Sequence, residues 1–338
     1  MKNTKKVAFI IGRFQIVHAG HIALINRANE IADQVVIIVG SINKPRTIKD
    51  PFTFEERQSM LAPQLGGWRN YSTQILGVPD SAYNDAEWVH NIQTSIFEIV
   101  GNDNDVVLVG HEKDESSFYL KMFPQWDYEN VDRVGENISA TEYRNNLFEG
   151  KHSFDLPKKT QTFLIEFRKT DAYTNLVQEY NFIKGYKQSW EDAPYAPTFV
   201  TADAVVVQSG HILLVKRRAA PGKGLWAFPG GFVNQQEKIF DACIRELREE
   251  TKLKVPDPVL RGSLRMSRVF DDPDRSLRGR TITHAFLFNL APSNILPVVK
   301  GADDAEKAKW IPLHEFFNMR GQMFEDHYDI GTNLIGTL

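Results

Sequence analysis

Residues 7–21 read Val-Ala-Phe-Ile-Ile-Gly-Arg-Phe-Gln-Ile-Val-His-Ala-Gly-His, an apolar run followed by a short loop with basic residues. The apolar run predicts a buried strand over 6–11, and apolar residues at helical spacing predict a helix over 20–32. A second apolar run at 35–39 completes a strand-helix-strand unit, whose default topology is a right-handed crossover in a parallel sheet. A further helix is expected at 86–100 and a further strand at 106–109. The first half therefore has the pattern of a doubly wound α/β fold.

The second half of the chain has a different pattern. A helical, charged stretch from about residue 155 ends at the segment 191–197, where two prolines indicate a linker. Two β-rich runs at 199–207 and 212–217 then flank a Gln-Ser-Gly-His turn and predict a hairpin, and one strong helix is expected at 238–253. We therefore expect a doubly wound parallel-sheet α/β domain over 1–187 with a helical extension from about 155, a linker over 188–198, and an α+β domain over 199–338.

The composition limits the kinds of partner. The 338 residues include 40 Lys and Arg against 43 Asp and Glu, which gives a net charge of −3. This balance argues against nucleic acid as a partner. The single cysteine, Cys243, excludes an internal disulfide and a cysteine-based zinc site, and it favours a cytoplasmic protein. Since no stretch approaches the roughly 20 uncharged residues of a membrane helix, no membrane association is expected. The oligomeric state stays open, a homo-oligomer included.

The loop at 12–21 lies between a strand end and a helix start, where open α/β sheets bind ligands. Free N–H groups at a helix start favour anions, and Arg13 with the imidazoles of His18 and His21 strengthens that preference. This arrangement predicts a polyphosphate site. In the competing interpretation, the two histidines are a helix cap and a core residue. Zinc is a weaker alternative, because paired zinc histidines on a helix usually stand four residues apart.

A second cluster consists of Ser139, Thr141 and Arg144. Its hydroxyls, helix-start N–H groups and guanidinium also suit phosphate oxygens. By itself, this pattern predicts only a well-capped helix.

Together the two clusters resemble the signatures of the nucleotidylyltransferase superfamily, a His-x-x-His loop and a Ser/Thr-x-x-x-x-Arg helix start. With Gly40-Ser41, Pro51-Phe52-Thr53 and Glu56-Arg57 between them, the longer pattern is similar to archaeal-type nicotinamide mononucleotide (NMN) adenylyltransferases. The resemblance implies transfer of the AMP moiety of ATP to NMN, with release of pyrophosphate and formation of NAD. Where many members have Gln-Pro, this chain has Gln15-Ile16.

The resemblance also implies roles for residues of this first site. A phosphate monoester is mostly ionised at neutral pH, so catalysis needs positioning and charge stabilisation rather than a general base. Mg²⁺ and four side chains would provide both: Arg13, His18, His21 and Arg144. The expected substrate contacts are Gly12, Phe14, Gln15, Ser41, Asn84, Trp88, Ser139 and Thr141. Asn84 and Trp88 are the candidates for the nicotinamide ring, although a core position explains Trp88 equally well.

Residues 231–250 carry the most specific pattern in the chain, Gly231-x₅-Glu237-x₇-Arg245-Glu246-Leu-x-Glu249-Glu250. The last three glutamates fall at i, i+3 and i+4, so their carboxylates share one helical face. Like charges at this spacing cost roughly a few tenths of a kcal/mol per pair, and a hard divalent cation relieves them well. The alternative, a solvated acidic face, would usually contain interspersed lysines.

This stretch resembles the Nudix box, whose family hydrolyses nucleoside diphosphates linked to another group. The resemblance implies a Mg²⁺ or Mn²⁺ site and an orienting ion pair from Arg245. The implied metal site comprises Gly230, Glu246, Glu249 and Glu250, the last two also with a catalytic role. Lys252 stands where the box has glycine. It must adopt a left-handed conformation, at about 1–2 kcal/mol, or the helix must end differently.

Two further stretches add candidates for the second site. Asp303, Asp304 and Glu306 are the candidates for a general base, with a solvated turn as the alternative. Residues 276–284 resemble a stretch of ADP-ribose-hydrolysing Nudix proteins and of related regulators of NAD metabolism. By that resemblance, Arg278 and Arg280 would grip the diphosphate, although such arginines are often surface charges.

The order of the two resemblances implies a bifunctional chain. The first site would make NAD from ATP and NMN, and the second would cleave ADP-ribose to AMP and ribose 5-phosphate, both with Mg²⁺ or Mn²⁺. Two alternatives stay open. The first site could use another phosphorylated acceptor such as phosphopantetheine, and the second could be a sensor that binds ADP-ribose without hydrolysis. The three intact glutamates argue against a sensor.

Overall fold

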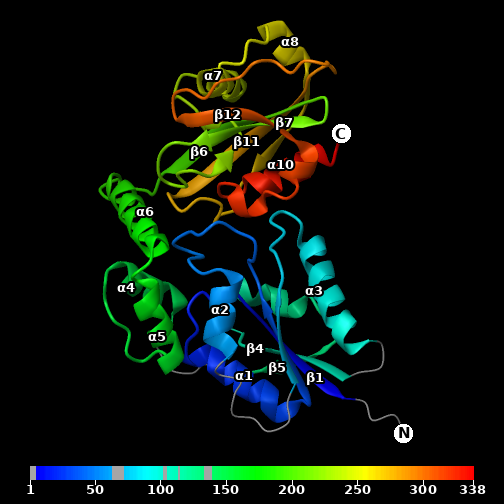
Figure 1. Ribbon diagram of the computed structural model, residues 1–338, viewed down its shortest axis with the longest axis vertical. Helices are drawn as coiled ribbons and strands as arrows, with labels where there is room; N and C mark the ends of the chain where they lie inside the picture. The colour runs from blue at the N-terminus through cyan, green and yellow to red at the C-terminus, as the bar shows by residue number, and fades with distance from the viewer. Residues whose placement is uncertain (1–4, 63–71, 102–104, 113–114, 133–138) are drawn as a thin grey trace. The chain divides into compact units, whose positions relative to one another are not determined.

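The computed structural model describes residues 5–62, 72–101, 105–112, 115–132 and 139–338. The chain divides into two compact units, Met1–Val177 and Gln178–Leu338 (Figure 1). The division falls inside a single helix, α6 (Asp171–Gln188), whereas the sequence analysis placed the end of the first domain at residue 187. The reason is that the second half of α6 packs with the second unit, through contacts such as that between the Tyr186 and Phe199 rings.

The first unit contains a five-stranded parallel sheet in the order β3-β2-β1-β4-β5. Its strands are β1 (Lys6–Gly12), β2 (Gln34–Val39), β3 (Ser72–Gly77), β4 (Asp105–Gly110) and β5 (Asp127–Asn130). β2 and β3 lie on one side of β1, whereas β4 and β5 lie on its other side. The chain therefore switches sides between β1 and β4, and ligands bind at the carboxyl ends of the strands at such a point. The doubly wound parallel sheet expected from the sequence is therefore confirmed.

Helices cover both faces of this sheet. They are α1 (Ala19–Ile31), α2 (Phe54–Leu61), α3 (Asp85–Val100), the 3₁₀ helix η2 (Glu115–Lys121), α4 (Ala140–Phe148) and α5 (Lys158–Phe167). Ile92 and Ile96 of α3 pack against Phe9 on one face. Since side chains alternate along a strand, the fully buried Ala8 and Ile10 face the other side. Burial on both faces explains why the strands are continuously apolar.

Arg57 joins the loops that follow the strands of the first unit. Its side chain is only 1% exposed. The guanidinium donates to the carbonyl oxygens of Arg13 (2.9 Å), Gly40 (2.6 Å), Ser41 (3.2 Å) and Thr53 (3.2 Å). Burial lowers the pKa of Arg57 from its ordinary value. One side chain thus fixes the relative positions of three loops at the carboxyl edge of the sheet.

We expect Arg57→Met to destabilise the first unit by roughly 3 kcal/mol or more, because buried carbonyls left without donors cost about 1–3 kcal/mol each. Urea unfolding of the full chain measures the change. Arg27→Met is the matched control, since Arg27 pairs with Glu30 and Glu129 at the surface, where ion pairs contribute about 1 kcal/mol or less. Equal effects of the two substitutions would contradict the structural role of Arg57.

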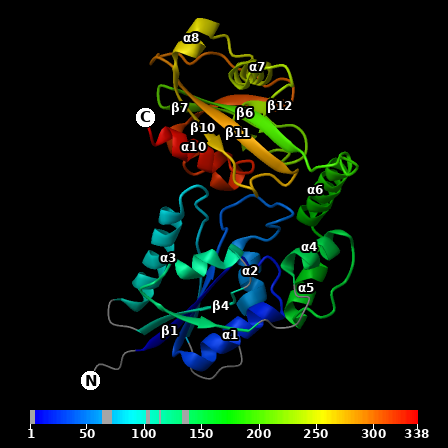
Figure 2. The same cartoon turned by 180° about the vertical axis from the view of Figure 1, so that it is seen from behind.

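The second unit is built on a mixed sheet in the order β10-β11-β6-β7-β12. β6 and β11 are parallel, and the other pairs on this path are antiparallel (Figure 2). Two short strands extend the sheet, since β8 pairs with β7 and β9 pairs with β6. The strands are β6 (Thr198–Gln208), β7 (His211–Arg217), β8 (Trp226–Ala227), β9 (Gly230–Phe232), β10 (Leu264–Phe270), β11 (Arg280–Asn289) and β12 (Ala305–Pro312). This arrangement confirms the expected α+β fold.

The helices of the second unit cover the two faces of this sheet. They are α7 (Ile239–Thr251), α8 (Asp257–Gly262), α9 (Leu313–Phe316), the 3₁₀ helix η3 (Arg320–Gln322) and α10 (His327–Ile335). Both ribbon views place α7 and α8 on one face and α10 on the other (Figures 1 and 2). The apolar side of α7, including Cys243 and Leu247, packs on Leu213 and Phe288 of the sheet. Its opposite side is left to carry the charged residues.

The end of α7 adopts the left-handed alternative. Lys252 has φ 52° and ψ 26°, and its N–H donates to the carbonyl of Arg248 at 2.9 Å. A lysine in this region carries a steric cost that glycine lacks. The left-handed lysine therefore preserves the helix end that glycine provides in the Nudix box.

Because glycine removes that cost, we expect Lys252→Gly to stabilise the second unit by about 1 kcal/mol. Thermal unfolding of the full chain measures the shift. Lys254→Gly is the control, since this exposed lysine lies beyond the helix end and should gain nothing. A loss of stability in Lys252→Gly would show that the lysine side chain contributes more than its backbone strain costs.

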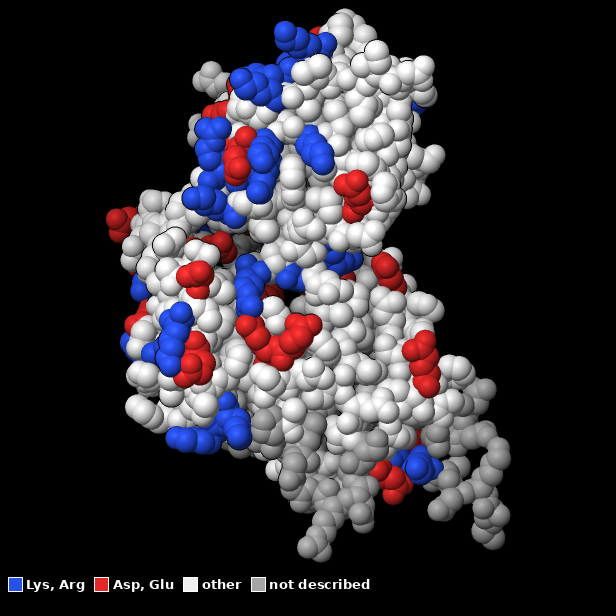
Figure 3. Space-filling model, viewed as in Figure 1, with Lys and Arg blue, Asp and Glu red and all other residues white. Residues whose placement is uncertain are grey.

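Two further observations concern the apolar character of the helices and the charges on the surface. Within the part of the chain that the structure describes, no helix has the length and apolar character needed to cross a bilayer. On the face drawn in Figure 3, Lys and Arg side chains are interspersed with Asp and Glu. This mixture matches the near balance of charges in the sequence.

Candidate active sites

The first candidate site begins with the two histidines after β1. Their rings stack with centroids 3.8 Å apart, and the His18 N–H donates to His21 Nδ1 at 3.3 Å. Burial lowers the pKa of His18 to about 4, and burial and the neighbouring His18 lower the pKa of His21 well below its ordinary value. Both imidazoles are therefore neutral at pH 7. His18 Nδ1 is buried and has no hydrogen-bond partner among the described residues. This ring nitrogen at the start of α1 is therefore available for a hydrogen bond with a ligand.

The loop that leads to His18 has an unusual backbone. Phe14 has φ 50° and Ile16 has φ 93°, and both side chains are buried. The Ile16 N–H donates to the Phe14 carbonyl at 3.0 Å. A proline at position 16 could neither adopt this φ nor donate this hydrogen bond. The Gln15-Ile16 pair is thus accompanied by a loop conformation that a Gln-Pro pair could not take.

Arg144 connects the second sequence cluster to this loop. Its Nη1 donates to the Gln15 carbonyl at 3.2 Å, and its Nη2 donates to Thr141 Oγ1 at 3.0 Å. Burial, aided by the nearby charge of Arg13, lowers the pKa of Arg144 to about 10, so the guanidinium stays charged at pH 7. The structure therefore brings Arg144 to the loop that carries Arg13 and His18, and it places Ser139 at the N-cap of α4.

Other predicted residues of the first site have partners within the protein. Gln15 uses both ends of its amide on the main chain of Phe52, donating to the carbonyl (3.2 Å) and accepting from the N–H (3.0 Å). Ser41 Oγ donates to Asp80 Oδ2 at 2.7 Å. Gly12 approaches the Phe14 ring, to which an added Cβ would come within 3.0 Å. In this structure, these residues shape the loops around the histidines.

The two candidates for the nicotinamide ring lie at the start of α3. Asn84 caps the helix by accepting from the Glu87 N–H at 3.2 Å, and it is exposed. Trp88 is partly buried, with ring centroids 5.9 Å from Phe123 and 6.1 Å from Tyr119. Trp88 thus packs on the edge of the core and keeps part of its surface accessible.

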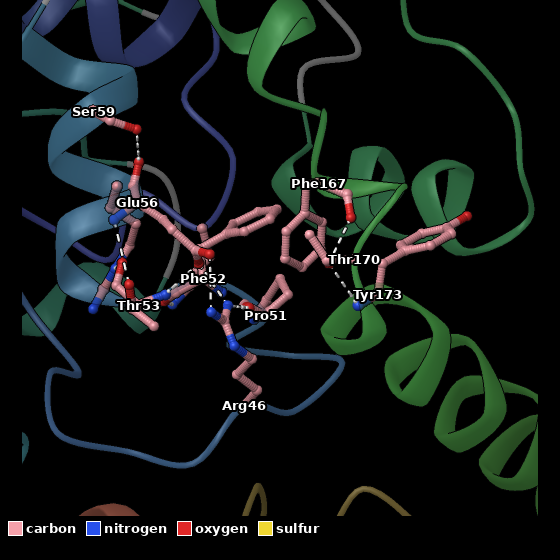
Figure 4. Close-up of polar contacts among 11 residues, drawn as sticks. Arg46, Pro51, Phe52, Thr53, Glu56, Ser59, Phe167, Thr170 and Tyr173 are labelled. Carbon is pink, nitrogen blue, oxygen red and sulfur yellow. Dashed lines mark hydrogen bonds and ion pairs between the residues drawn. The ribbon is translucent and has the colours of Figure 1, made fainter. Parts of the chain in front are cut away.

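The loop before α2 contributes residues that no sequence pattern marked. Arg46 pairs with Glu56 through two bonds of 2.5 and 2.9 Å, donates to the Pro51 carbonyl, and lies over the Phe167 ring at 5.6 Å (Figure 4). Phe52 also meets Phe167 edge to face, with centroids 5.0 Å apart. The helical extension therefore supports this loop directly. No spacing rule links residue 46 to residue 167, so the contact required the folded structure.

The second candidate site is a pocket of about 300 Å³ against α7. Glu250 Oε2 accepts the Gly230 N–H at 3.0 Å, and burial, reinforced by Glu246, raises the pKa of Glu250 to about 8. Burial also raises the pKa of Glu246. The helix thus holds carboxylates where their negative charge is unfavourable without a cation, although no group of three or more acidic or histidine side chains is preassembled as a metal cage among the described residues.

Arg245 holds the carboxylates of this site in place. It donates to both oxygens of Glu237 at 2.9 Å, to Glu246 at 2.8 Å and to Glu249 at 2.9 Å. The hydrogen bonds to Glu237 are the main cause of the raised pKa of Arg245. This is the orienting ion pair that the Nudix resemblance implied.

The glycines before α7 permit close approach of the backbone. A Cβ on Gly231 would lie 2.6 Å from Glu246 Oε1, and one on Gly230 would lie 2.2 Å from an oxygen of Asp203. At Gly230 a side chain would also collide with the backbone of Ala202 and Asp203, so this position requires glycine, whereas at Gly231 a side chain would displace the Glu246 carboxylate.

The structure separates the remaining candidates of the second site. Arg278, Asp303 and Asp304 line the pocket. Arg280 instead pairs with Asp271, at 3.7 Å between Nη2 and Oδ2. Glu306 is exposed and does not line the pocket.

The pocket also contains residues that sequence analysis missed. Arg217 lies 4.1 Å over the Phe324 ring, and Glu325 faces Arg278. Arg275 and Asp326 form a buried bidentate pair at 2.9 Å. These side chains come from β7 and from the two loops that precede β11 and α10. Because these charged residues lie on separate segments without a regular spacing, no sequence pattern could reveal that they share a pocket.

Comparisons with known proteins agree with this division. A cytidylyltransferase-like family model matches residues 9–146, and a NUDIX domain model matches residues 197–334. A crystal structure of a bifunctional NMN adenylyltransferase/ADP ribose pyrophosphatase from Francisella tularensis, complexed with AMP and a Mn ion, is 39% identical. It covers 99% of both chains with a TM-score of 0.93. This chain belongs to that bifunctional family. The two family resemblances of the sequence analysis are thereby confirmed.

Separate relatives match each half of the bifunctional arrangement. A nicotinamide/nicotinic acid mononucleotide adenylyltransferase from Acinetobacter baylyi is 36% identical over 50% of this chain and 90% of its own length. An ADP-ribose pyrophosphatase from Methanocaldococcus jannaschii is 34% identical over 36% of this chain and 65% of its own length. The bifunctional family thus combines two parts that also occur in separate proteins.

Proposed function

We propose that this chain has both activities of its family. The first site transfers the AMP moiety of ATP to NMN and forms NAD and pyrophosphate, and the second hydrolyses ADP-ribose to AMP and ribose 5-phosphate. The observation that carries the proposal is the presence of both site geometries in one chain. Arg144 of α4 donates to the histidine loop of the first unit, and Arg245 bonds to the glutamates of the second.

At the first site, the residues act by positioning and charge stabilisation. The NMN phosphate is already mostly ionised at neutral pH and attacks without a general base. Arg13 and Arg144 supply fixed positive charge, and the start of α1 supplies N–H groups for the phosphates. The buried imidazoles are neutral in the free protein, and an approaching triphosphate raises their pKa and favours the protonated, donating form.

A divalent cation is proposed at both sites, and the donors present fit it differently. At the second site, Glu246, Glu249 and Glu250 offer the oxygen ligands that Mg²⁺ and Mn²⁺ accept. Burial makes uncompensated charge costly on two of them, Glu246 and Glu250. At the first site, the triphosphate oxygens would provide most ligands, as is usual for Mg²⁺ with nucleotides. When bound, the cation neutralises phosphate charge and acidifies water.

Asp303 is the proposed proton acceptor of the hydrolysis. It lines the pocket and lies close enough to Glu246 to contribute to the raised pKa of that carboxylate. Its φ of 53° places it at a strained turn, a feature that is common at functional sites. Glu306, which does not line the pocket, is not retained as a candidate for this role.

Two assays of the purified full chain test the proposal. With Mg²⁺, ATP and NMN, it should release pyrophosphate and form NAD, and phosphopantetheine in place of NMN should give no product. With Mn²⁺ or Mg²⁺ and ADP-ribose, it should release AMP. Binding of ADP-ribose without metal-dependent AMP release would instead identify the second unit as a sensor.

A further inference from the structure

Four arginines line the pocket of the second site, and their existing partners distinguish them. Arg245 is bonded to three carboxylates, and Arg275 is held by the buried Asp326. Arg217 donates through Nε to the Pro221 carbonyl and lies over a ring. Arg278 differs, because its only acidic partner in the described structure is Glu325, with Nη2 and Oε2 separated by 3.9 Å. Such a distance is too long for a direct hydrogen bond.

The surroundings of Arg278 hold its guanidinium in the pocket. The guanidinium carbon, Cζ, of Arg278 lies 5.3 Å from the centre of the Phe232 ring and 6.0 Å from that of the Phe324 ring. The side chain is 14% exposed, so it is mostly desolvated but still reachable from the pocket. A cation in this setting binds an anion strongly, and a substrate diphosphate is a stronger anion than one carboxylate.

Glu325 is placed to compete for that cation. Its side chain is 11% exposed, and its φ of 45° puts a non-glycine residue in the left-handed region. Charged groups near it include Arg275 from the loop before β11, Arg217 from β7 and its own neighbour Asp326, and Ser276 contributes a hydrogen bond. The buried and titratable His327, at the start of α10, lines the same pocket. Burial raises the pKa of Glu325 to about 7, so the carboxyl can change its charge near neutral pH.

We propose that Glu325 holds Arg278 in place of the substrate diphosphate, and that diphosphate binding transfers Arg278 to the phosphate oxygens while Glu325 takes up one proton from solvent. The inference rests on the proposed function, since it requires the second site to bind a diphosphate. Losing a cation and gaining a neighbouring anion both favour the protonated carboxyl. Glu325 thereby couples substrate affinity to pH without contacting the reacting phosphorus.

The sign of the coupling follows from the charge of Glu325 in the free protein. At pH 6 the carboxyl is mostly protonated and does not compete, so the substrate binds at full affinity. At pH 8 it is mostly ionised, and binding must first protonate it. With one linked proton, affinity should weaken about tenfold from pH 6 to pH 8. A diphosphate diester does not itself titrate in this range.

Titration calorimetry with α,β-methylene ADP-ribose, which cannot be cleaved at the bridging position, tests the proposal at saturating Mg²⁺. For the unmodified chain, we expect the tenfold weakening and an uptake at pH 8 that approaches one proton, measured in buffers of different ionisation enthalpy. Glu325→Gln keeps the size of the side chain and cannot titrate. It should bind equally at pH 6 and pH 8, about tenfold tighter than the unmodified chain at pH 8, with the uptake lost.

Glu315→Gln is the matched control, since Glu315 is an exposed glutamate on α9 and should leave the pH dependence unchanged. Thermal unfolding checks that both variants are folded. An unchanged pH dependence in Glu325→Gln overturns the proposal, and so does weaker binding at both pH values, which would make Glu325 a direct substrate ligand. If the unmodified chain fails to bind the analogue at any pH, the proposed function itself is wrong and this inference falls with it.

Discussion

His18→Ala should reduce NAD synthesis by about 10²–10³-fold or more and leave ADP-ribose hydrolysis unchanged. His18 stands at the N-cap of α1, stacks on His21 and carries a buried ring nitrogen without a partner in the described structure. Removing one group that stabilises transition-state charge typically costs a factor of this size. Rates of pyrophosphate release and of AMP release, measured on the same preparation, report the two sites separately.

The matched control is His152→Ala, an exposed histidine of the first unit outside the α1 loop, which should keep both activities. Because α1 loses its stacked pair in His18→Ala, thermal unfolding should accompany the assays. NAD synthesis at an undiminished rate would exclude His18 from the catalytic machinery. Loss of both activities in a folded variant would contradict the independence of the two sites.

Glu250→Gln should have the opposite pattern, with ADP-ribose hydrolysis lowered by about 10³-fold and NAD synthesis retained. The carboxylate is a proposed ligand of the divalent cation, and an amide of the same size offers one neutral oxygen in its place. The metal should therefore bind weakly or in the wrong position. AMP release at saturating Mn²⁺ measures the loss.

A second measurement separates metal binding from chemistry. Burial raises the pKa of Glu250 to about 8 in the folded, metal-free protein. Ionisation of this carboxyl therefore destabilises the fold once the pH rises above the pKa that Glu250 has in the unfolded chain. Glu250→Gln removes that charge and should leave the metal-free protein at least as stable at pH 8. Mn²⁺ stabilises the unmodified chain by binding the folded state, and this increase in Tm should be lost in the variant.

Glu315→Gln again serves as the control, with normal hydrolysis and a normal response to Mn²⁺. A Glu250→Gln variant that keeps its thermal response to Mn²⁺ but loses hydrolysis would show that Glu250 acts on the reaction and does not bind the metal. Retention of full hydrolysis would remove Glu250 from the site altogether.

What a sequence motif does not reveal is clearest at Gln15 and in the loops near it. The motif marked Gln15 as a substrate contact, and the structure shows both ends of its amide bonded to Phe52, 37 positions away. Arg57 and Arg46 similarly act on loops and on a helix that lie near them only in the folded chain. A motif identifies which residue types occur together, but it does not say whether a polar group faces the ligand or the protein.

The same limit applies in the second unit. Arg278 and Arg280 are two residues apart and were equivalent candidates, yet Arg278 lines the pocket and Arg280 pairs with Asp271. Glu325 carried no recognisable pattern, and only its position beside Arg278 gives it a role. The boundary inside α6 was also hidden, because a continuous helix has no local signal for the unit on which each half packs.

By itself, the sequence determined the two fold classes, the family of each half, the histidine loop and the glutamate face of α7. These features depend on interactions within one or two turns or between adjacent elements, so short-range spacing and residue type are sufficient. The tertiary structure decided which side chains share a pocket, which polar groups are already satisfied, and where burial shifts a pKa. Those properties depend on which distant segments exclude water from one another, as between Arg144 and the Gln15 carbonyl or between Glu325 and Arg278.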